Sequence, residues 1–336
     1  MVGSDPGRLG SAVPSSRRRA PAKVNLGLRI LGRRSDGMHL LESVFLPLDL
    51  CDEVEVSLAP PGCFRIELEG CGAGVPADDR NLALRAARGF CRRAGLGDGA
   101  VVRLHKRIPV AAGLGGGSSD AAAVLRGLDA LRPGILSAQE RFALALELGA
   151  DVPYFLEPQP ALVEGVGERV CPLAGVPSFA LLLVYPGTRV PTPAVYERFD
   201  QLSASLTPAG AGSTLRALLA LRDTPEGMRS SALEGLAAAG SPADRAERIA
   251  GQLAAMLRND LEAAAVALCP AVAEEREEIE ATGALAVGMS GSGPTLFGVY
   301  EDSQRAQRAL RHWRERREGL APGPRSWVVV TRGSRT

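Results

Sequence analysis

Hydrophobic and polar residues alternate along several stretches of the chain, beginning at residues 24–30. A period of two is typical of a half-buried strand. A polar turn follows, and residues 40–58 then predict two further strands. Alternation or a short apolar run also predicts strands in residues 64–70, 99–110, 179–187 and 326–333, a hairpin in 161–173, and a strand–turn–strand unit in 284–300.

Other stretches repeat their hydrophobic residues every three or four positions, which predicts helices. One such pattern begins at Asp120 and ends at Pro133–Gly134, and Ser137 is a candidate cap for the helix that follows. Further helices are expected in residues 81–95, 138–149, 257–268, 271–283 and 302–317. Residues 201–251 are rich in Ala, Gly, Ser and Pro, and we expect helices joined by loops there.

Strands and helices are mixed without the regular alternation of a doubly wound sheet, so we predict an α+β fold. The length of 336 residues corresponds to about two domains. We expect ordered structure to begin near Pro21, which leaves residues 1–20 as a mobile tail.

The composition argues against several classes of function. A formal net charge of +1 gives no general attraction to nucleic acid or to an anionic membrane, and aromatic residues make up only 4% of the chain. No apolar run approaches the roughly 20 residues that span a bilayer, and no apolar segment of a secretory signal follows the arginines at 17–19. We therefore expect a cytoplasmic protein that binds neither nucleic acid nor membrane. For its assembly, we expect a monomer or a weak homodimer.

The six cysteines are scattered without a CxxC pair, and the three histidines are too dispersed to form a metal cluster with them. We predict free thiols, and these residues indicate no metal ligand.

The stretch PVAAGLGGGSSDAAAVL, Pro109 to Leu125, places four glycines within five positions directly before a helix. Small residues let backbone N–H groups converge, and a helix N-terminus adds unsatisfied donors and partial positive charge. The loop is therefore suited to bind an anion, with a glycine-rich connector as the alternative. It is not a P-loop, because Ser118 stands where that motif requires Lys, and its glycine spacing does not match a Rossmann fingerprint.

This loop resembles the phosphate loop of the GHMP small-molecule kinases, which wraps the ATP triphosphate. Two further stretches match in the same order, APAKVNLGLRILGRRSDGMH at 20–39 and MSGSGPTLFG at 289–298. Shorter similarities lie at 79–87, 148–153, 186–196 and 257–262. The resemblance covers most of residues 20–330 and is weakest between 201 and 251.

The resemblance implies a two-domain GHMP kinase fold, with a ribosomal-S5-like N-terminal, ATP-binding domain at residues 21–172 and an α/β C-terminal domain at 173–336. It implies ATP as co-substrate, and Asn81 and Lys106 match positions near the adenine. Mg²⁺ is expected because ATP carries it. No protein ligand of the metal is predicted, although Ser119 is a candidate. The implied ATP-binding loop consists of Pro109, Val110, Ala111, Ala112, Gly113, Leu114, Gly115, Gly116, Gly117, Ser118 and Ser119.

Lys23 and Asp151 match the catalytic positions of the family. Phosphoryl transfer needs alignment, charge neutralisation and a partner for the hydroxyl proton. Asp151 would accept or orient that proton, and Lys23 would keep the carboxylate charged and stabilise the oxygen. Whether Asp151 removes the proton or only positions it stays open.

On the acceptor side, the motifs most resemble those of family members that phosphorylate a cytidyl-linked alcohol at a tertiary hydroxyl. A small-molecule cytidyl substrate is therefore implied, with Asn25, His39, Thr192 and Tyr196 as its binding residues. His39 is expected to hydrogen-bond the cytosine edge or to stack on the ring. Met38 stands where many relatives have an aromatic residue, and its thioether can cover a ring face.

Two positions near the loop have less definite roles. Asp120 either lies near the metal or caps the helix, and both interpretations stay open. The turn at residues 290–293, followed by Pro294, is expected to approach the site from the second domain.

Two other functions compete with this interpretation. Another GHMP kinase activity is disfavoured by the RSDGMH stretch at 34–39. A catalytically idle nucleotide-binding protein would be marked by loss of Lys23 or Asp151, and the chain has both.

Overall fold

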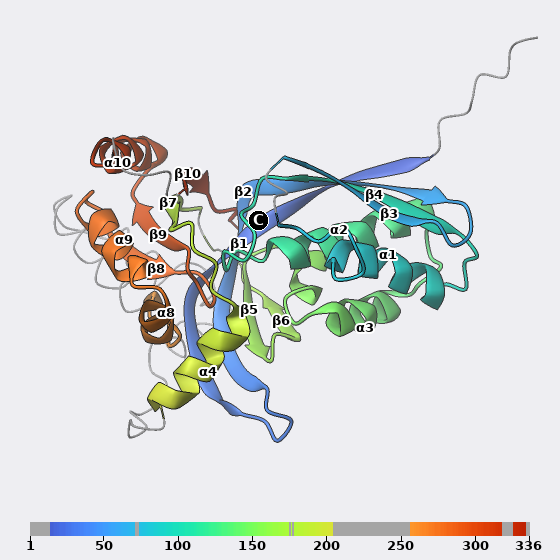
Figure 1. Ribbon diagram of the computed structural model, residues 1–336, viewed down its shortest axis with the longest axis horizontal. Coiled ribbons are helices and arrows are strands. Elements are labelled where there is room, and N and C mark those ends of the chain that lie inside the picture. Colours follow the sequence, from blue (N-terminus) through green and yellow to red (C-terminus); the bar gives the residue numbers. More distant parts are fainter. Residues whose placement is uncertain are drawn as a thin grey trace, which may run out of the picture.

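A computed structural model describes residues 14–70, 74–174, 176, 178–203, 256–317 and 325–333. The chain forms two lobes, each built on one β-sheet (Figure 1). The first sheet has the order β3-β4-β2-β5-β6 with β1 paired to β2, and the second has the order β10-β7-β9-β8. The first sheet contains β1 (Ser15–Arg33), β2 (His39–Ala59), β3 (Phe64–Gly70), β4 (Gly99–Lys106), β5 (Ala161–Gly165) and β6 (Arg169–Pro172). The second contains β7 (Ala180–Tyr185), β8 (Ala286–Met289), β9 (Leu296–Tyr300) and β10 (Arg325–Val330).

Strands β1 and β2 form one long antiparallel ribbon, and this corrects two predictions. Residues 40–58 belong to a single strand because β2 continues through Pro47, where its pairing with β1 shifts in register. An interrupted ladder is a position where a strand tolerates proline. Residues 15–20 are not a tail, since they pair with the far end of β2, from Ser15 opposite Ser57 onward. Residues 1–13 lie outside the described residues.

Two helices, α1 (Leu82–Arg93) and α2 (Gly116–Leu131), pack on the first sheet, and α3 (Ala138–Leu148) packs against these two helices. Helix α2 begins four residues before the predicted Asp120, because Gly115 caps it in a left-handed conformation with φ of 70°. Ser137 caps α3 in a reciprocal pair with Glu140, as its sequence indicates. A 3₁₀ turn, Pro153–Leu156, follows α3.

The second lobe contains α4 (Thr192–Ser203), α8 (Glu262–Leu268), α9 (Ala271–Glu280) and α10 (Ser303–Glu315). Helix α8 is shorter than the predicted 257–268, because the backbone around Asn259 pairs with β1 at Leu28. After α4, the predicted helices of residues 204–251 lie outside the described residues.

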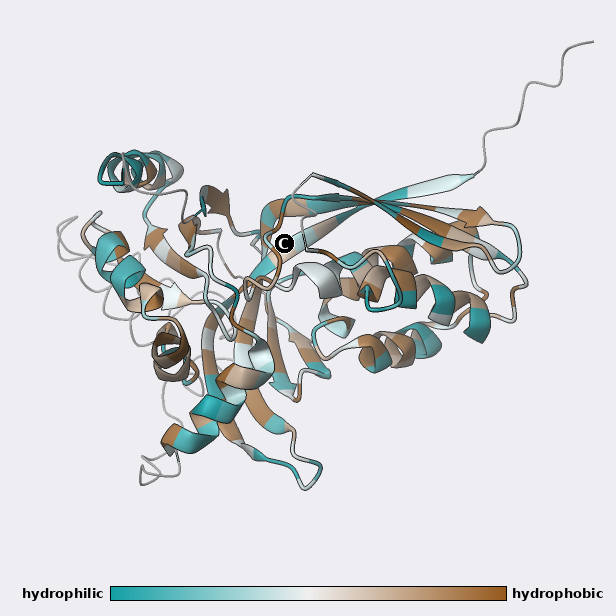
Figure 2. Ribbon diagram, viewed as in Figure 1, coloured by the Kyte–Doolittle hydropathy of each residue, from teal (hydrophilic) through white to brown (hydrophobic). Residues whose placement is uncertain are grey.

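A continuous hydrophobic core joins the two lobes. It packs Leu26 and Leu46 of the first sheet and Leu114 of the loop against Leu183 and Phe297 of the second sheet. Figure 2 shows the hydrophobic colouring of the second-sheet strands and of α8. The α+β fold is confirmed, and the sheets change between β6 and β7, near the predicted boundary at 172. The division into independent domains stays a prediction. In the described part of the chain, no helix has the length and apolar character to cross a membrane.

Candidate active site

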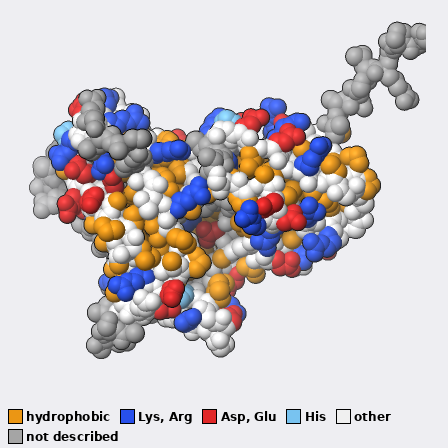
Figure 3. Space-filling view, in the orientation of Figure 1, with side chains coloured by type: hydrophobic (Ala, Val, Ile, Leu, Met, Phe, Trp, Pro, Cys, Tyr) orange, Lys and Arg blue, Asp and Glu red, His pale blue; other side chains and the backbone are white. Residues whose placement is uncertain are grey.

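A cavity of about 1010 Å³ opens where the two lobes meet (Figure 3). The first lobe contributes β1, β2 and the glycine-rich loop, and the second contributes α4 and the turn after β8. Of the residues predicted for the site, only Ser119 does not line it. The predicted residues along the wall are Lys23, Asn25, His39, Asn81, Lys106, residues 109–118, Asp151, Thr192 and Tyr196.

The loop at residues 109–118 presents backbone amides to this cavity. Ala111, Gly113 and Gly115 have φ angles of 55°, 75° and 70°, so left-handed residues recur at alternate positions. Successive N–H groups in such turns form a concave anion-binding nest. The amides of residues 116–118 form the first turn of α2 and have no intrahelical acceptor. Loop and helix together provide a site for a phosphate chain.

Two backbone carbonyls of the loop accept hydrogen bonds from residues outside it. The backbone N–H of Lys23 donates to the carbonyl of Leu114 at 3.0 Å, and the Ser290 hydroxyl donates to the carbonyl of Gly113 at 2.9 Å. The loop is thus fixed to β1 and to the second lobe at the same point. The turn at residues 290–293 therefore reaches the site, as the sequence predicts.

Lys23 and Asp151 lie together at the edge of the loop, although 128 positions separate them in sequence. The Lys23 Nζ is 3.7 Å from Asp151 Oδ2 and 4.5 Å from the centre of the Phe45 ring. Burial lowers the pKa of Lys23, and the charge of Asp151 opposes that shift. The lysine side chain is 4% exposed and the aspartate side chain 33%, so the carboxylate is accessible from the cavity.

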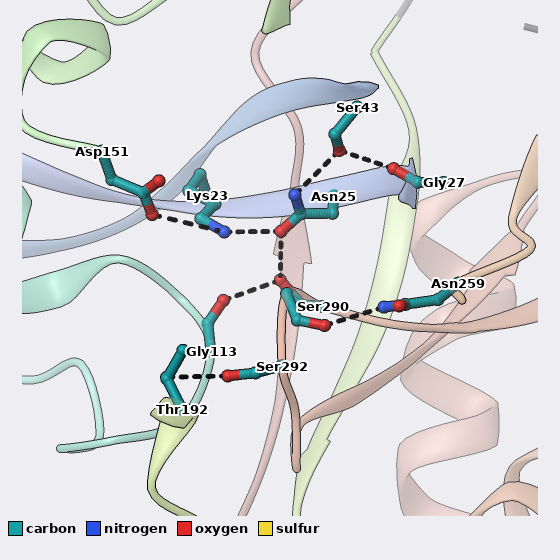
Figure 4. Close-up of polar contacts among 11 residues, drawn as sticks. Lys23, Asn25, Gly27, Ser43, Gly113, Asp151, Thr192, Asn259, Ser290 and Ser292 are labelled. Carbon is teal, nitrogen blue, oxygen red and sulfur yellow. Dashed lines mark hydrogen bonds and ion pairs between the residues drawn. The ribbon is translucent and has the colours of Figure 1, made fainter. Parts of the chain in front are cut away.

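Asn25 links this pair to the interior of the sheet (Figure 4). Its Oδ1 accepts from Lys23 Nζ at 2.5 Å, and its Nδ2 donates to the Ser43 hydroxyl at 2.8 Å. The Ser43 hydroxyl donates in turn to the carbonyl of Gly27 at 2.5 Å. Asn25 therefore contacts Lys23 from a fixed position.

Lys106 is part of a buried charge cluster under the start of α2. Its Nζ donates to Asp52, and it contacts Asp120 Oδ2 at 2.7 Å. All three side chains are at most 4% exposed. Burial raises the pKa of Asp120, Lys106 opposes that shift, and Asp52 adds to it. A Cβ built on Gly116 would be 3.4 Å from Lys106 Nζ, so the ammonium lies beside the helix N-terminus.

The structure excludes one of the two interpretations of Asp120, that it caps the helix. The N-cap of α2 is Gly115, so Asp120 does not cap the helix. Asp120 Oδ1 and Ser119 Oγ are buried and have no hydrogen-bond partner among the described residues. A carboxylate and a hydroxyl are oxygen donors of the kind that Mg²⁺ prefers.

Asn81 is the N-cap of α1. Its Oδ1 accepts from the N–H of Ala83 at 2.9 Å, and its Nδ2 donates to the carbonyl of Pro76 at 2.8 Å. The structural role of Asn81 is thus clear, and it also forms part of the cavity wall.

His39 and Tyr196 meet at the hairpin end of the β1–β2 ribbon, where His39 pairs with Arg33. Their ring centres are 4.8 Å apart, and His39 Nε2 is 2.7 Å from Asp200 Oδ1 on α4. A carboxylate only accepts, so Nε2 carries a proton and Nδ1 remains for a ligand. The rings are too close to admit a base between them. Met38 is 49% exposed beside them and lines the cavity.

Thr192 lies at the start of α4, and its hydroxyl is 2.8 Å from that of Ser292. This contact joins α4 to the turn that also holds the loop. Thr192 and Tyr196 are one helical turn apart and both line the cavity.

Four residues at or behind the site were missed from the sequence: Ser43, Asp52, Asp200 and Asn259. Asn259 donates to the carbonyls of Met289 and Gly291 and so holds the turn. The one available signal was the polar residue in a buried strand, as at Ser43 and Asp52. Asp200 lies on the second lobe and meets His39 only through the packing of the lobes. Asn259 bonds a turn of its own lobe that lies about 30 positions further along the chain.

Free thiols agree with the prediction for the described part of the chain, where Cys51, Cys63, Cys91, Cys171 and Cys269 are unpaired. Cys71 lies outside the described residues.

Fold and site together define a class of small-molecule kinase. The family model described as "GHMP kinases N terminal domain" matches residues 81–157, and "GHMP kinases C terminal" matches residues 232–318. A homoserine kinase from Cytophaga hutchinsonii shares the fold, with a TM-score of 0.66 at 20% identity, covering 97% of this chain and 96% of that one.

Curated relatives are closer. A 4-diphosphocytidyl-2-C-methyl-D-erythritol kinase of Geobacter sp. (strain M21) is 36% identical, covering 91% of this chain and 97% of the relative. One from Deinococcus radiodurans is 39% identical over 86% of both chains. A crystal structure of 4-(cytidine 5'-diphospho)-2C-methyl-D-erythritol kinase has a TM-score of 0.70 at 38% identity, covering 95% of this chain and 100% of that one. The chain belongs to the GHMP kinase family, in the group of the 4-diphosphocytidyl-2-C-methyl-D-erythritol kinases.

Proposed function

We propose that the protein transfers the γ-phosphoryl group of ATP to the 2-hydroxyl of 4-diphosphocytidyl-2-C-methyl-D-erythritol, in the non-mevalonate route to isoprenoid precursors. The observation that carries this proposal is one cavity that combines an amide-lined loop, a lysine–aspartate pair and a ring-lined end. The names of the relatives support the identity of the acceptor. We place the reaction in the cytoplasm, where ATP is available.

The loop at 109–118 would hold the triphosphate through its backbone N–H groups. Because the bonds from Lys23 and Ser290 already occupy two loop carbonyls, the loop keeps its shape without the ligand. Preorganised donors lose little free energy to reorganisation when charge develops on the phosphates. Asp120, which lines the cavity, would offer an oxygen to Mg²⁺, with the buried hydroxyl of Ser119 as a second candidate, and the metal would neutralise charge on the β- and γ-phosphates.

Asp151 would accept the proton of the acceptor hydroxyl, or orient it, as phosphorus approaches the oxygen. Lys23, 3.7 Å away, would keep the carboxylate ionised and stabilise the attacking oxygen. Asn25 would bind the acceptor from the same side. The cytosine would stack against Tyr196 or under Met38, with His39 Nδ1 accepting from its amino group.

The test is ³¹P NMR of the purified protein with ATP, Mg²⁺ and the cytidyl substrate. We expect ADP and a new phosphomonoester signal. Asp151→Asn should lower kcat about 10²- to 10⁴-fold, because it removes the proton acceptor, while the melting temperature stays near that of the wild type.

Two results would contradict the proposal. Activity on homoserine or mevalonate, with none on the cytidyl compound, would assign the protein to another GHMP kinase activity. ATP binding without turnover of any of these acceptors would indicate a nucleotide-binding protein without catalysis.

A further inference from the structure

Ser43 lies directly behind the catalytic pair but has no contact with the cavity. It is a fully buried residue of β2, and none of the sequence motifs of the site includes it. Two hydrogen bonds, through the side chain of Asn25, connect its hydroxyl with Lys23 Nζ (Figure 4).

The carbonyl of Gly27, at the buried end of this chain of hydrogen bonds, fixes which group donates in each of them. The carbonyl of Gly27 can only accept, so the Ser43 hydroxyl donates its single proton there. The Ser43 oxygen then offers only lone pairs to Asn25, and Asn25 must present its NH₂ group to it. The Asn25 Oδ1 therefore faces Lys23, the orientation in which an ammonium finds an acceptor.

Ser290 does little to fix the orientation of that amide. Its hydroxyl lies 3.5 Å from Asn25 Oδ1 but 2.9 Å from the carbonyl of Gly113. A hydroxyl has one proton, and the shorter contact takes it. Of the side chains bonded to Asn25, Ser43 is thus the one that selects between the two orientations of the amide from outside the reacting groups.

We propose that Ser43 is a positioning residue for phosphoryl transfer: it fixes the amide of Asn25 so that its Oδ1 holds Lys23 toward Asp151. The inference rests on the kinase function proposed above, since the reaction rate reports it. With an alanine at position 43, the amide of Asn25 loses its buried acceptor. The amide is then free to leave the position in which its Oδ1 accepts from Lys23 Nζ, and Lys23 loses the acceptor that holds it toward Asp151.

Ser43→Ala tests this in steady-state kinetics with ATP and the cytidyl substrate. We expect kcat to fall about tenfold and KM for ATP to stay within about twofold, because the loop is unchanged. The alkaline limb of the kcat profile should move to lower pH, since an ammonium without its acceptor holds its proton less tightly. Ser43→Thr keeps the hydroxyl and should retain most of the rate. Ser16→Ala, at a buried serine of β1 outside the cavity, is the matched control and should leave kcat unchanged.

A double-mutant cycle separates positioning from a general loss of packing. If Ser43 acts through Asn25, Ser43→Ala costs nothing further in an Asn25→Ala background. Independent losses that multiply, or a wild-type kcat in a folded Ser43→Ala protein, would overturn the inference. If Ser43→Ala does not fold, Ser43→Cys, with its weak thiol donor, replaces it in the same cycle. A wild-type protein inactive on the cytidyl substrate would instead overturn the proposed function.

Discussion

At the scale of the residue, the chemistry of the site depends on polar side chains whose partners come from distant parts of the sequence. Motif similarity was sufficient to place Lys23 beside Asp151. It did not indicate that Lys106 is held between Asp52 and Asp120, because a strand pattern records only burial and not which charge lies opposite. Local sequence therefore predicts the residues that meet in the cavity better than the residues that hold them in place.

Asp200 gives a prediction for base recognition. Asp200→Ala should raise KM for the cytidyl substrate about tenfold, the effect of losing one charge-assisted hydrogen bond. The physical reason is that His39 loses the partner that keeps its Nδ1 free to accept from the cytosine amino group. Steady-state kinetics provides the measurement.

Glu197→Ala is the matched control, because it removes an exposed carboxylate from the cavity wall on the same helix. Equal effects of the two variants would show that the charge of α4, and not the contact with His39, matters for binding.

Asp120 predicts a pH dependence of stability. Its pKa is raised from 3.8 to about 7 in the folded protein, chiefly by burial. Its contribution to stability is therefore fully present below about pH 4 and is lost as the pH rises through about 7. Asparagine does not ionise, so the Asp120→Asn variant does not lose stability in this way as the pH rises. The melting temperature of the variant minus that of the wild type should increase from pH 5 to pH 8, measured by thermal unfolding without nucleotide.

A difference that stays constant over this range would show that Asp120 ionises alike in the folded and unfolded chains. The charged groups facing Asp120 in this test are Lys106 and Asp52.

At the scale of the element, sequence periodicity located most strands and helices, and it failed where tertiary contacts decide their ends. The unit at 257–268 has a helical pattern, but its first residues pair with Leu28 and leave the helix. The start of α2 was placed too late because glycine has a low helix propensity, whereas Gly116 is needed there for close approach: its Cβ would lie 3.1 Å from Ile108 Cγ2.

Gly115 tests the geometry of the loop. An alanine would have to adopt a φ of 70°, and its Cβ would lie 2.7 Å from the Phe155 ring and 3.2 Å from Lys23 Cγ. A left-handed conformation costs a non-glycine residue about 1–2 kcal/mol. We expect Gly115→Ala to raise KM for ATP at least about tenfold and to lower kcat as Lys23 shifts.

Gly117→Ala is the comparison within the same helix. Its Cβ would meet only Leu82 Cδ1, at 3.8 Å, and its backbone is helical. Alanine should stabilise the protein by about 0.5–1 kcal/mol. Its effect on KM for ATP should be much smaller than that of Gly115→Ala, and a similar effect would contradict the role of left-handed backbone in the loop.

At the scale of the whole molecule, the mixture of strands and helices predicted the α+β fold and the resemblance predicted the family, but neither predicted how the lobes are joined. Alternation and periodicity describe one element at a time. The core from Leu26 to Phe297 and the pairing of Asn259 with Leu28 of β1 exist only after the lobes meet. The extension of β1 back to Ser15 was missed as well, because residues 15–20 pair with the end of β2 near Ser57, about 40 positions away in sequence.

Asn259 tests the joint between the lobes. Asn259→Ala removes two donors from the turn that holds the loop, and it leaves the carbonyls of Met289 and Gly291 without them. An unsatisfied buried group costs about 1–3 kcal/mol, so the melting temperature should fall by about 2–6 °C. KM for ATP should rise as well, because the turn reaches the loop through Ser290.

Thr295→Val is the control, since it removes a buried hydroxyl that has no hydrogen-bond partner among the described residues. If Asn259→Ala lowers the melting temperature without changing KM for ATP, the turn does not shape the loop.

The cavity is continuous from the phosphate loop to the rings of His39 and Tyr196. For the proposed kinase, one inhibitor could therefore occupy both ends: an adenosine and a cytidine joined by a polyphosphate bridge. Once the first half is bound, the second half binds at a high effective concentration, and its affinity gains by orders of magnitude when the bridge matches the span.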